Sequence, residues 1–595
     1  MSNVYVWKYP HENLGEALRR FDGLLASQAA SLSSAFGRSF RHSAKRVGDV
    51  LIGHVDRTDS NGVGSWRSWV DCGSYGVAWS GICEEYLGAE MDEVATRKLH
   101  ETALQDPEQI GRLTGNFLLI SWAEDSECVC ITTGDTMSPP LWWTSGRDGW
   151  ACGSRAAPLF DIVAAQPRFD ADSAALFLSS SYHLSGGTFF SGTQRVGVRQ
   201  QVVVRRGSEP EPREYLSVTE YLLGDSRRIV EGTEAIRECA DTLVHRTSRQ
   251  LLFSANPIVE LSGGRDSRCV AAAIFRGGNK ITAHTGGAPG SPEVRIARSL
   301  AEALCFGHSV ETLEHDRLSV LLEHRDEARH WLRLSEGLET IRQGLHWERF
   351  FRGSLPVFEN DTQFFSGLHF GMLKPTISMT AAGLFKNLPR ALTNHRAAEE
   401  RLGDIVASTN ELTNSVLGEN YGDAAWSLMF YWQRRCTLWG SNVMSIKYPA
   451  AWYWLPLVDR TLLRWSWQLM RERSEPPAFI DSITHLNAPH IASLKYVSDL
   501  SRRGILARGV AKAWRLLRRG VLPTHRTESR MKLDAQFFPI SAQRPKMWKE
   551  FFEANDHAWK DLIDKRFVVD LMERHPQSQL LWNLATTELV AQEFF

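Results

Sequence analysis

The feature that most constrains this chain is a glycine-containing loop between a short apolar run and a helical stretch. The segment Val259 to Arg268 reads V-E-L-S-G-G-R-D-S-R. The paired glycines Gly263 and Gly264 allow a tight turn and let bare backbone N–H groups approach an anion. The helix that opens after the turn adds the partial positive charge of its N-terminus. The hydroxyl groups of Ser262 and Ser267 can donate further hydrogen bonds, so the segment predicts a phosphate-binding turn.

An acidic residue, Asp266, stands inside this loop, which is otherwise suited to anions. A carboxylate fits there if Mg²⁺ lies between it and the phosphate groups, because hard cations prefer oxygen ligands. The plain alternative is a glycine-rich turn that only joins a strand to a helix. The complete S-G-G-x-D-S pattern between a strand and a helix favours the phosphate site over that alternative.

The first 215 or so residues read as strand-rich. Short apolar runs alternate there with Gly- and Asp-containing turns, which predicts an antiparallel sheet system. The apolar runs are 116–122, 128–132 and 201–205, and helices are expected over 14–36 and 94–104. A polar, Pro-containing stretch at 207–213 is either a hairpin tip or the start of a linker.

From about residue 228 the pattern changes to alternating helices and strands. Helical spacing of apolar residues predicts a helix over 229–253. A strand over 257–261, the glycine loop, a helical segment over 269–275, a strand over 280–285 and a helix over 291–304 follow. This alternation is typical of a parallel α/β sheet, and the remainder of the chain is mostly helical in texture. We therefore expect two domains, at 1–215 and 228–595.

Composition excludes several classes of protein. The chain has 68 Lys plus Arg against 69 Asp plus Glu, and a balance of this kind argues against a general nucleic-acid binder. The chain has no run of about 18 apolar residues, so we expect no membrane-spanning helix. Its N-terminus lacks the basic start and apolar run of a secretory signal. The nine cysteines are odd in number and lack zinc-type spacing. We expect a cytoplasmic protein with reduced thiols.

The S-G-G-x-D-S segment resembles the pyrophosphate loop of the ATP pyrophosphatases, and its surroundings are similar to the asparagine synthetase branch of that family. Four further segments resemble motifs of that branch in the same order. They are Gly290–Glu293 for its Gly-Ser-Pro-Asp segment, Phe364–Gly367 for its third strand and Ser-Gly turn, Leu455–Asp459 for its Pro-Phe-Leu-Asp helix start, and Leu522–Lys532 for its Leu-Pro…Arg-x-Lys segment. The strand-rich first region, above all 113–156, resembles the glutaminase domain that precedes the synthetase domain. The resemblance spans nearly the whole chain, but only the loop is strongly specific.

The resemblance implies a two-domain α/β (α+β) protein. Its first domain would be a glutaminase-like β-sandwich with helices, of the N-terminal-nucleophile (Ntn) type. Its second would be a parallel-sheet ATP pyrophosphatase domain rich in helices. ATP and Mg²⁺ would be the cofactors, with Asp266 as a metal ligand. The residues assigned to nucleotide binding are Leu261, Ser262, Gly263, Gly264, Asp266, Ser267, Thr285, Gly286, Ser366 and Gly367.

The chain departs from the family at the glutaminase nucleophile. The family uses an N-terminal Cys that is exposed when Met1 is removed, whereas residue 2 here is Ser. A thiol is a far better nucleophile near neutral pH than an unactivated hydroxyl. We therefore expect Ser2 to be an ordinary terminal residue, and the amine of the reaction to come from a source other than glutamine.

A second departure follows the third strand. The family reads Ser-Gly-Glu-Gly-x-Asp-Glu there, whereas this chain reads S-G-L-H-F-G-M over 366–372, so both expected carboxylates are missing. Asp266 would then be the only family-type Mg²⁺ ligand, unless Asp361 or Glu359 substitutes. His369 is a candidate for acid–base work because a histidine pKa can lie near neutrality, and a bystander loop histidine is the alternative. The missing carboxylates also keep open the possibility that the chain binds ATP poorly.

By the same resemblance, Lys532 is the active-site lysine and Arg530 assists it. Formation and breakdown of an acyl adenylate build negative charge on pentavalent and tetrahedral centres, and a fixed cation there lowers the barrier. The alternative is a solvated lysine in a loop.

Two further features bear on the substrate. Seven of the 21 tryptophans fall between 426 and 467, where core packing is the default and lining of a broad, peptide-sized cavity is the alternative. Residues 501–520 contain seven Arg or Lys and no acid, interleaved with apolar residues. That pattern fits a basic amphipathic helix docking on a partner, an acidic peptide or a membrane surface, or else a solvated helix face.

These features together predict an ATP-dependent, AMP-forming amide ligase. Among relatives of asparagine synthetase without glutaminase activity, the chain most resembles the lasso peptide cyclases. These join the N-terminal amine of a core peptide to an Asp or Glu side chain, forming a macrolactam. The partners implied are a precursor peptide, a leader-binding protein and a leader peptidase. The alternatives are a β-lactam synthetase, an ammonia-dependent asparagine synthetase, and a non-catalytic scaffold that binds a peptide.

Overall fold

The computed structural model describes most of the chain. The described residues are 3–9, 14–58, 68–134, 137–223, 232–288, 290–312, 321–323, 325–343, 362–368, 380–418, 421–449, 451–473, 479–496, 544–555, 558–576 and 578–595. Among them, no helix is both long and apolar enough to cross a membrane.

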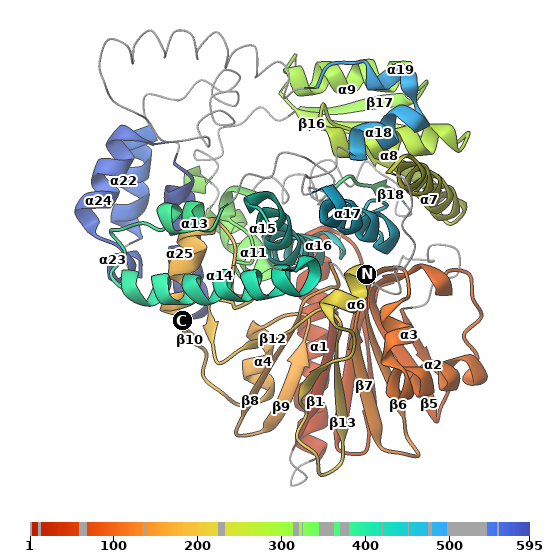
Figure 1. Ribbon diagram of the computed structural model, residues 1–595. Helices are drawn as coiled ribbons and strands as arrows, with labels where there is room; N and C mark the ends of the chain where they lie inside the picture. The colour runs from red at the N-terminus through yellow and green to blue at the C-terminus, as the bar shows by residue number, and fades with distance from the viewer. Residues whose placement is uncertain are drawn as a thin grey trace.

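The first part of the chain, whose described residues run from 3 to 223, forms two antiparallel sheets of six strands each (Figure 1). One sheet has the order β12-β8-β9-β1-β3-β2. Its strands are β1 (Asn3–Lys8), β2 (Phe40–Val47), β3 (Val50–Arg57), β8 (Leu141–Gly146), β9 (Gly149–Gly153) and β12 (Gln194–Val196). The other has the order β14-β13-β7-β6-β5-β4. Its strands are β4 (Trp69–Asp71), β5 (Tyr75–Cys83), β6 (Gly115–Ala123), β7 (Cys128–Thr133), β13 (Gln200–Arg205) and β14 (Pro212–Glu214).

The two sheets pack face to face around an apolar layer. Val4 and Ile52 of the first sheet share this layer with Leu118, Ile120 and Ile131 of the second. Helix α1 (Leu14–Phe36) covers the outer face of the first sheet, and α2 (Glu93–Gln105) and α3 (Pro107–Gly111) flank the second. The unit is therefore a four-layered arrangement of helix, sheet, sheet and helix.

A parallel sheet of five strands lies in the second part of the chain, whose described residues begin at 232 (upper right in Figure 1). Its order is β17-β16-β15-β18-β19, and every pair of neighbours is parallel. The strands are β15 (Asn256–Glu260), β16 (Thr282–Gly287), β17 (Gly307–Thr312), β18 (Thr362–Phe365) and β19 (Trp452–Trp454). The helices around it are α7 (Gly232–Leu252), α8 (Arg265–Arg276), α9 (Pro292–Ala303), α18 (Phe479–Asn487) and α19 (Pro489–Ala492).

The rest of the described chain is mostly helical. Its elements are α11 (Arg325–Ser335), α13 (Ala381–Asn387), α14 (His395–Leu417), α15 (Asp423–Phe430), the π-helical segment η6 (Tyr431–Gly440), α16 (Ser441–Lys447), α17 (Arg460–Arg473), α22 (Arg544–Ala554), α23 (Trp559–Leu562), α24 (Lys565–Arg574) and α25 (Gln579–Phe594). Smaller elements of the first part are η2 (Glu84–Tyr86), α4 (Ala157–Ile162), β10 (Arg168–Phe169), α5 (Ala171–Ser180), β11 (Phe190–Ser191) and α6 (Val218–Leu223).

The C-terminal helix α25 joins the two parts of the chain. Residues Leu581 to Ala591 are all buried, so α25 runs through the interior rather than along the surface. The Asn583 side-chain amide donates to the Leu178 carbonyl oxygen at 2.9 Å, which ties α25 to α5. A helix that is buried on all sides belongs to a core, and this core is shared by both parts.

The elements expected from the sequence pattern are confirmed, with small shifts at their ends. Helix α1 has the expected bounds, α2 and α7 match 94–104 and 229–253, and β15, β16 and α9 appear where the alternation predicted them. The stretch 207–213 belongs to a hairpin rather than a linker, because β14 begins within it at Pro212 and pairs with β13. All nine cysteines are free thiols. Six of the seven tryptophans between 426 and 467 are buried, and Trp439 is half-buried, so core packing explains most of this segment.

Candidate active site

The predicted loop follows the central strand of the parallel sheet at the point where the strand order reverses. β16 and β17 lie on one side of β15, and β18 and β19 lie on the other. Ligands of open α/β sheets bind outside the carboxyl ends of the strands at such a reversal. Since β15 ends at Glu260 and β18 ends at Phe365, the segments 262–267 and 366–367 both emerge at this edge.

The loop is held together by its own hydroxyl groups. The Ser262 N–H donates to the Ser267 hydroxyl at 3.0 Å, and the two hydroxyl oxygens lie 2.8 Å apart. The Gly264 N–H donates to the Ser262 hydroxyl at 3.2 Å. Gly264 is also the residue that precedes α8. The turn therefore runs straight into a helix N-terminus, where the helix dipole favours an anion.

The loop amide of Gly263 is already directed at an anionic group. Its N–H donates to Glu293 Oε1 at 2.9 Å. Glu293 stands in the first turn of α9, where the Ser291 side chain caps the helix by accepting from the Val294 N–H. A phosphate that bound this amide would compete with the Glu293 carboxylate.

The turn after β18 packs directly on the loop. The Ser366 N–H donates to the Trp454 carbonyl oxygen at 2.9 Å, which fixes the turn against β19. A Cβ atom added at Gly367 would lie 2.5 Å from the backbone nitrogen of Ser267 and 2.6 Å from the carbonyl carbon of Asp266. Only glycine allows this approach. The structure thus brings Ser366 and Gly367 to the S-G-G-x-D-S loop, about 100 residues away in sequence.

Thr285 holds the start of the loop in place. Its hydroxyl donates to the Leu261 carbonyl oxygen at 2.7 Å and lies 2.9 Å from His308 Nε2. The Leu261 N–H donates in turn to the His284 carbonyl oxygen. Thr285 and Leu261 are buried, and Gly286 follows in the same strand beside β17. Thr285 therefore adjoins the loop and fixes Leu261, the residue from which the loop starts.

Two arginines of α8 tie the helix to the residues before position 497. Arg265 Nε donates to both carboxylate oxygens of Asp481, at 3.0 and 3.2 Å. The buried Arg268 donates to the carbonyl oxygens of Leu494 and Lys495, at 2.7 and 2.9 Å. The Tyr496 ring lies 4.3 Å from the Arg265 guanidinium and 3.9 Å from that of Arg268. The described chain before residue 497 thus ends beside the start of α8.

Several residues predicted from the sequence lie outside the described residues. They are Ser2, Glu359, Asp361, His369, Arg530, Lys532 and the basic stretch 501–520. Leu368, which is described, has its N–H directed at the Ser366 hydroxyl at 3.3 Å.

Asp266 fits the position of a single protein ligand to Mg²⁺. It stands at the start of α8, next to Ser267 and the Gly367 contact. Within the described part of the chain, no cluster of three or more metal-ligating side chains occurs. Mg²⁺ is commonly held by one or two carboxylates together with substrate phosphates and water. Asp266 would supply the carboxylate, and the metal would neutralise phosphate charge.

Three buried cysteines of the first part do not have the character of nucleophiles. Cys83, Cys130 and Cys152 are buried. Burial raises the pKa of Cys130 to about 12 and raises the pKa of Cys83 as well. Thiols with raised pKa values carry little thiolate at neutral pH and are inert.

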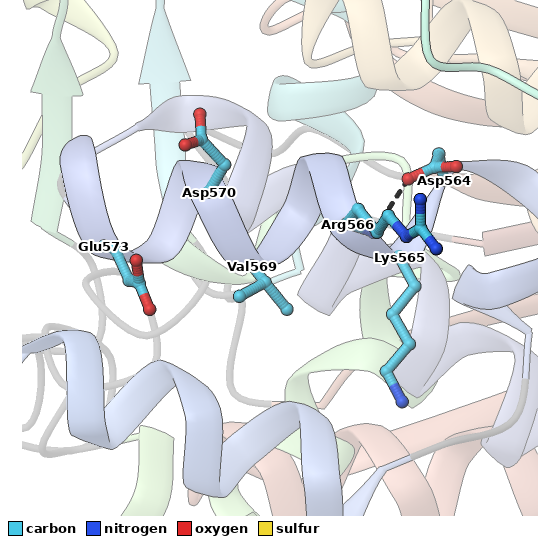
Figure 2. A pocket seen from close by; sticks show the side chains of 6 residues that line it. All are labelled: Asp564, Lys565, Arg566, Val569, Asp570 and Glu573. Atoms are coloured by element: carbon cyan, nitrogen blue, oxygen red, sulfur yellow. Dashed lines mark hydrogen bonds between the residues drawn. The ribbon is translucent and has the colours of Figure 1, made fainter.

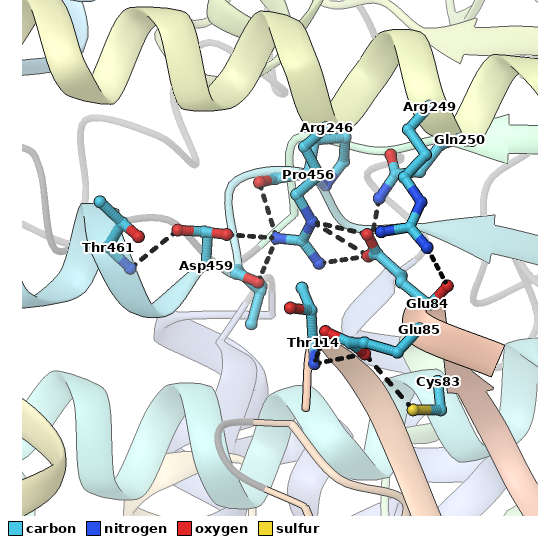
Figure 3. A network of polar contacts seen from close by, with 11 residues as sticks. Cys83, Glu84, Glu85, Thr114, Arg246, Arg249, Gln250, Pro456, Asp459 and Thr461 are labelled. Carbon is cyan, nitrogen blue, oxygen red and sulfur yellow. Dashed lines mark hydrogen bonds and ion pairs between the residues drawn. The ribbon is translucent and has the colours of Figure 1, made fainter. Parts of the chain in front are cut away.

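A buried ion-pair network joins the two parts of the chain (Figure 3). Arg246 of α7 pairs with Glu84 at 2.6 Å and with Asp459 at 3.5 Å. It also donates to the carbonyl oxygens of Pro456 and Val458, at 3.0 and 2.5 Å. Glu84 comes from η2 after β5, and 456–459 is the turn between β19 and α17. A carboxylate of the first part therefore holds a turn of the second, through one arginine.

A second polar cluster was not foreseen from the sequence. Lys447 is buried at the end of α16, 3.6 Å from the Glu260 carboxylate, and its Nζ lies 4.6 Å from the centre of the Tyr453 ring. Glu339 is buried close by, and burial raises its pKa to about 8. The only sequence signal was Glu260 itself, an acid two residues before a phosphate-type loop.

A surface hollow of about 550 Å³ lies along α24 (Figure 2). Asp564, Lys565, Arg566, Val569, Asp570 and Glu573 line it. Figure 1 places α24 on the opposite side of the molecule from α8. Five of the six lining residues are charged, with both signs present, and we assign the hollow no role.

No protein-family model and no curated protein sequence matches the chain. Solved structures do match. The allosteric regulatory enzyme of purine biosynthesis has 11% identity and a TM-score of 0.24, over 68% of this chain and 78% of that chain. Glutamine phosphoribosylpyrophosphate amidotransferase from B. subtilis, complexed with ADP and GMP, has 12% identity and a TM-score of 0.23, over 72% and 95%. Because TM-scores of this size do not establish a shared fold, neither structure assigns an activity to this chain.

Proposed function

We propose that this chain is an ATP-dependent, AMP-forming amide ligase that closes a macrolactam in a linear peptide, as lasso peptide cyclases do. The observation that carries the proposal is the S-G-G-x-D-S turn at the N-terminus of α8, with Ser366 and Gly367 packed on it. Hydroxyl groups, backbone amides and a helix N-terminus suit the pyrophosphate portion of ATP.

The reaction has two steps. An Asp or Glu side-chain carboxylate of the peptide attacks the α-phosphorus of ATP, which forms an acyl adenylate and releases pyrophosphate. The peptide's N-terminal amine then attacks the acyl carbon. A C–N bond forms, the C–O bond to the phosphate breaks, AMP leaves with that electron pair, and the amine loses a proton. By resemblance, Lys532 and Arg530 would stabilise the charge that builds in both steps.

The substrate class rests on the resemblance and on the sequence. Ser2 in place of the family's Cys removes the glutamine-derived ammonia and favours an amine carried by the substrate itself. The basic stretch 501–520 fits a macromolecular substrate or partner. The buried tryptophans add little, because most of them serve the core. A leader-binding protein and a leader peptidase are the proposed partners.

Mass analysis of the product tests this proposal. Linear peptides with a free N-terminal Gly and an Asp or Glu several positions on are incubated with ATP, Mg²⁺ and the purified protein, alone and with the two partner proteins. We expect a product lighter by one water and resistant to proteases. Turnover of free aspartate with ammonia, or of a small amino-acid derivative, in place of peptides would instead support an asparagine synthetase or a β-lactam synthetase.

A further inference from the structure

One face of the parallel sheet carries an unusual set of polar side chains. Glu260 pairs with His284 across β15 and β16, and Glu311 pairs with Gly286 two positions further on. On the other side of β15, Ile258 pairs with Phe364, which pairs with Tyr453. Because side chains alternate along a strand, Glu260, Glu311 and Tyr453 point to the same face.

This face lies opposite the helices that follow the loop. Gly287 belongs to the other face, where a Cβ added to it would lie 2.9 Å from Val294 of α9. Gly367, in the turn after β18, meets the first residues of α8. The face with Glu260 is covered instead by α16, whose Lys447 reaches the Glu260 carboxylate.

Tyr453 has an unused hydroxyl on this face. The residue is 1% exposed, and its Oη has no hydrogen-bond partner among the described residues. Its ring stacks on Phe364 with centroids 5.1 Å apart. Burial raises the Tyr453 pKa, and Glu260 and Glu311 raise it further, so a neutral phenol stands beside two carboxylates. A buried hydroxyl left unpaired is costly, and a ligand that paired with it would recover that cost.

Negative charge outnumbers positive charge here. Glu260 and Glu311 face one lysine here, Lys447, which lies 3.6 Å from Glu260. Glu339 also lies near Lys447, but its raised pKa leaves it protonated near neutral pH. His284 Nε2 lies 3.8 Å from Glu311. Lys447 shows what the face accommodates, because its own ammonium group lies between a carboxylate and an aromatic ring. Carboxylates with an aromatic face are the usual surroundings of a bound ammonium. A divalent metal fits less well, because an aromatic ring and a phenol donor offer it little.

We propose that Glu260, Glu311 and Tyr453 form the site that binds the substrate's primary amine, and that Lys447 is a positioning residue that holds Glu260. The inference rests on the proposed function and names its amine site. Glu260 precedes Ser262 by two residues, so an amine held there lies beside the loop that binds the phosphates. The acyl adenylate would form next to it, and the amine would attack after one of the two carboxylates, Glu260 or Glu311, takes its proton.

Two half-reactions separate amine binding from adenylation. The variant Glu260→Gln removes one charge and keeps the side-chain shape. We expect it to retain ATP–pyrophosphate exchange and hydroxamate formation with added hydroxylamine, which needs no amine site. Macrolactam formation should fall about tenfold or more, the effect of removing a charged hydrogen-bond partner. Glu302→Gln, at an exposed position of α9, is the control and should behave as the wild type. Equal loss of both half-reactions in Glu260→Gln, or loss of neither, would overturn the inference.

Direct binding keeps the test independent of turnover. Calorimetry compares a linear peptide with its N-acetylated twin, in the absence of ATP. We expect acetylation to weaken binding about tenfold in the wild type and to have no effect in Glu260→Gln, since the ion pair is already lost. Equal affinities of the two peptides for the wild type would overturn the amine site. Absence of pyrophosphate exchange in the wild type, with the acetylation effect present, would instead contradict the proposed ligase function.

Discussion

Gly367 is the residue at which the candidate site leaves the least room. A Cβ atom there meets backbone atoms of Asp266 and Ser267, which cannot turn aside as a flexible side chain can. We expect Gly367→Ala to push the turn away from the loop at a strain of about 1–3 kcal/mol. The dissociation constant for ATP, measured by titration, should then rise roughly tenfold, since 1.4 kcal/mol is a factor of ten.

The control for this variant is Gly403→Ala in α14. Nothing lies within 4 Å of the added Cβ at Gly403. Alanine should stabilise the helix by about 0.4–1 kcal/mol and leave ATP binding unchanged. Unchanged ATP affinity in Gly367→Ala would show that the turn plays no part in the site.

Glu339 should make the free energy of unfolding depend on pH, and the direction of that dependence follows from its pKa. Burial raises its pKa to about 8, whereas the unfolded carboxyl titrates near its ordinary value of 4.5. Between these values the folded state holds a proton that the unfolded state has lost, so stability is full at low pH and falls as the pH rises toward 8. We expect Glu339→Gln to flatten this slope. The check is the urea midpoint of both proteins between about pH 5 and pH 8. Parallel slopes would contradict the assignment.

At the scale of single elements, α8 is fixed to the 488–496 segment by Arg268. Its guanidinium donates hydrogen bonds to the carbonyl oxygens of Leu494 and Lys495 and lies against the Tyr496 ring. A lysine keeps the charge, but it lacks the planar fork of donors that reaches several carbonyl oxygens and the flat group that stacks on the ring. We expect Arg268→Lys to increase amide exchange in peptides covering 488–496 about tenfold, corresponding to a loss of roughly 1.4 kcal/mol of local stability. Unchanged exchange would contradict this role of Arg268.

Elements with a strong local pattern were predictable from the sequence. Apolar residues at helical spacing gave α1 its bounds, and Ser291 followed by Pro292 marked the start of α9. β1 was not predicted, because its residues Asn3 to Trp7 are all buried and show no alternation. Its partners β3 and β9 come from distant parts of the chain. The π-helical segment η6 was also missed, since its sequence reads as an ordinary helix.

The candidate site was predictable only in part, for the same reason. The loop residues follow one another in the chain, so their chemistry could be read directly from the sequence. Lys447 stands at a helix end, where a lysine is usually solvated. Only the packing of α16 on the sheet brings it to Glu260 and Tyr453. Such a cluster depends on tertiary contacts that local patterns do not encode.

Across the molecule, the buried ion pair between Glu84 and Arg246 links the first part of the chain to the second. Both side chains are about 95% buried, and the arginine also holds the turn that leads to α17. Removing one partner of a buried pair costs about 3–5 kcal/mol, because the other charge is left uncompensated. We expect Glu84→Gln to lower the free energy of unfolding by about this amount, measured by urea denaturation.

The matched control is Glu108→Gln. Glu108 forms an exposed ion pair with Arg112 at 3.3 Å, one helical turn away. Its loss should cost at most about 0.5 kcal/mol. Similar small losses in both variants would show that the buried network does not hold the two parts together.

In the proposed function, the loop at the start of α8 activates a carboxylate with ATP. The most direct measurement is AMP release from ATP by the purified protein with linear peptide substrates, with the partner proteins present. We predict AMP and pyrophosphate in equal amounts from the wild type and from Asp404→Asn, an exposed change in α14. Asp266→Asn should release at least about a hundredfold less AMP, since a preorganised electrostatic contact is lost. No AMP from the wild type under any of these conditions, or equal AMP from Asp266→Asn, would contradict this role of the loop and favour a peptide-binding scaffold.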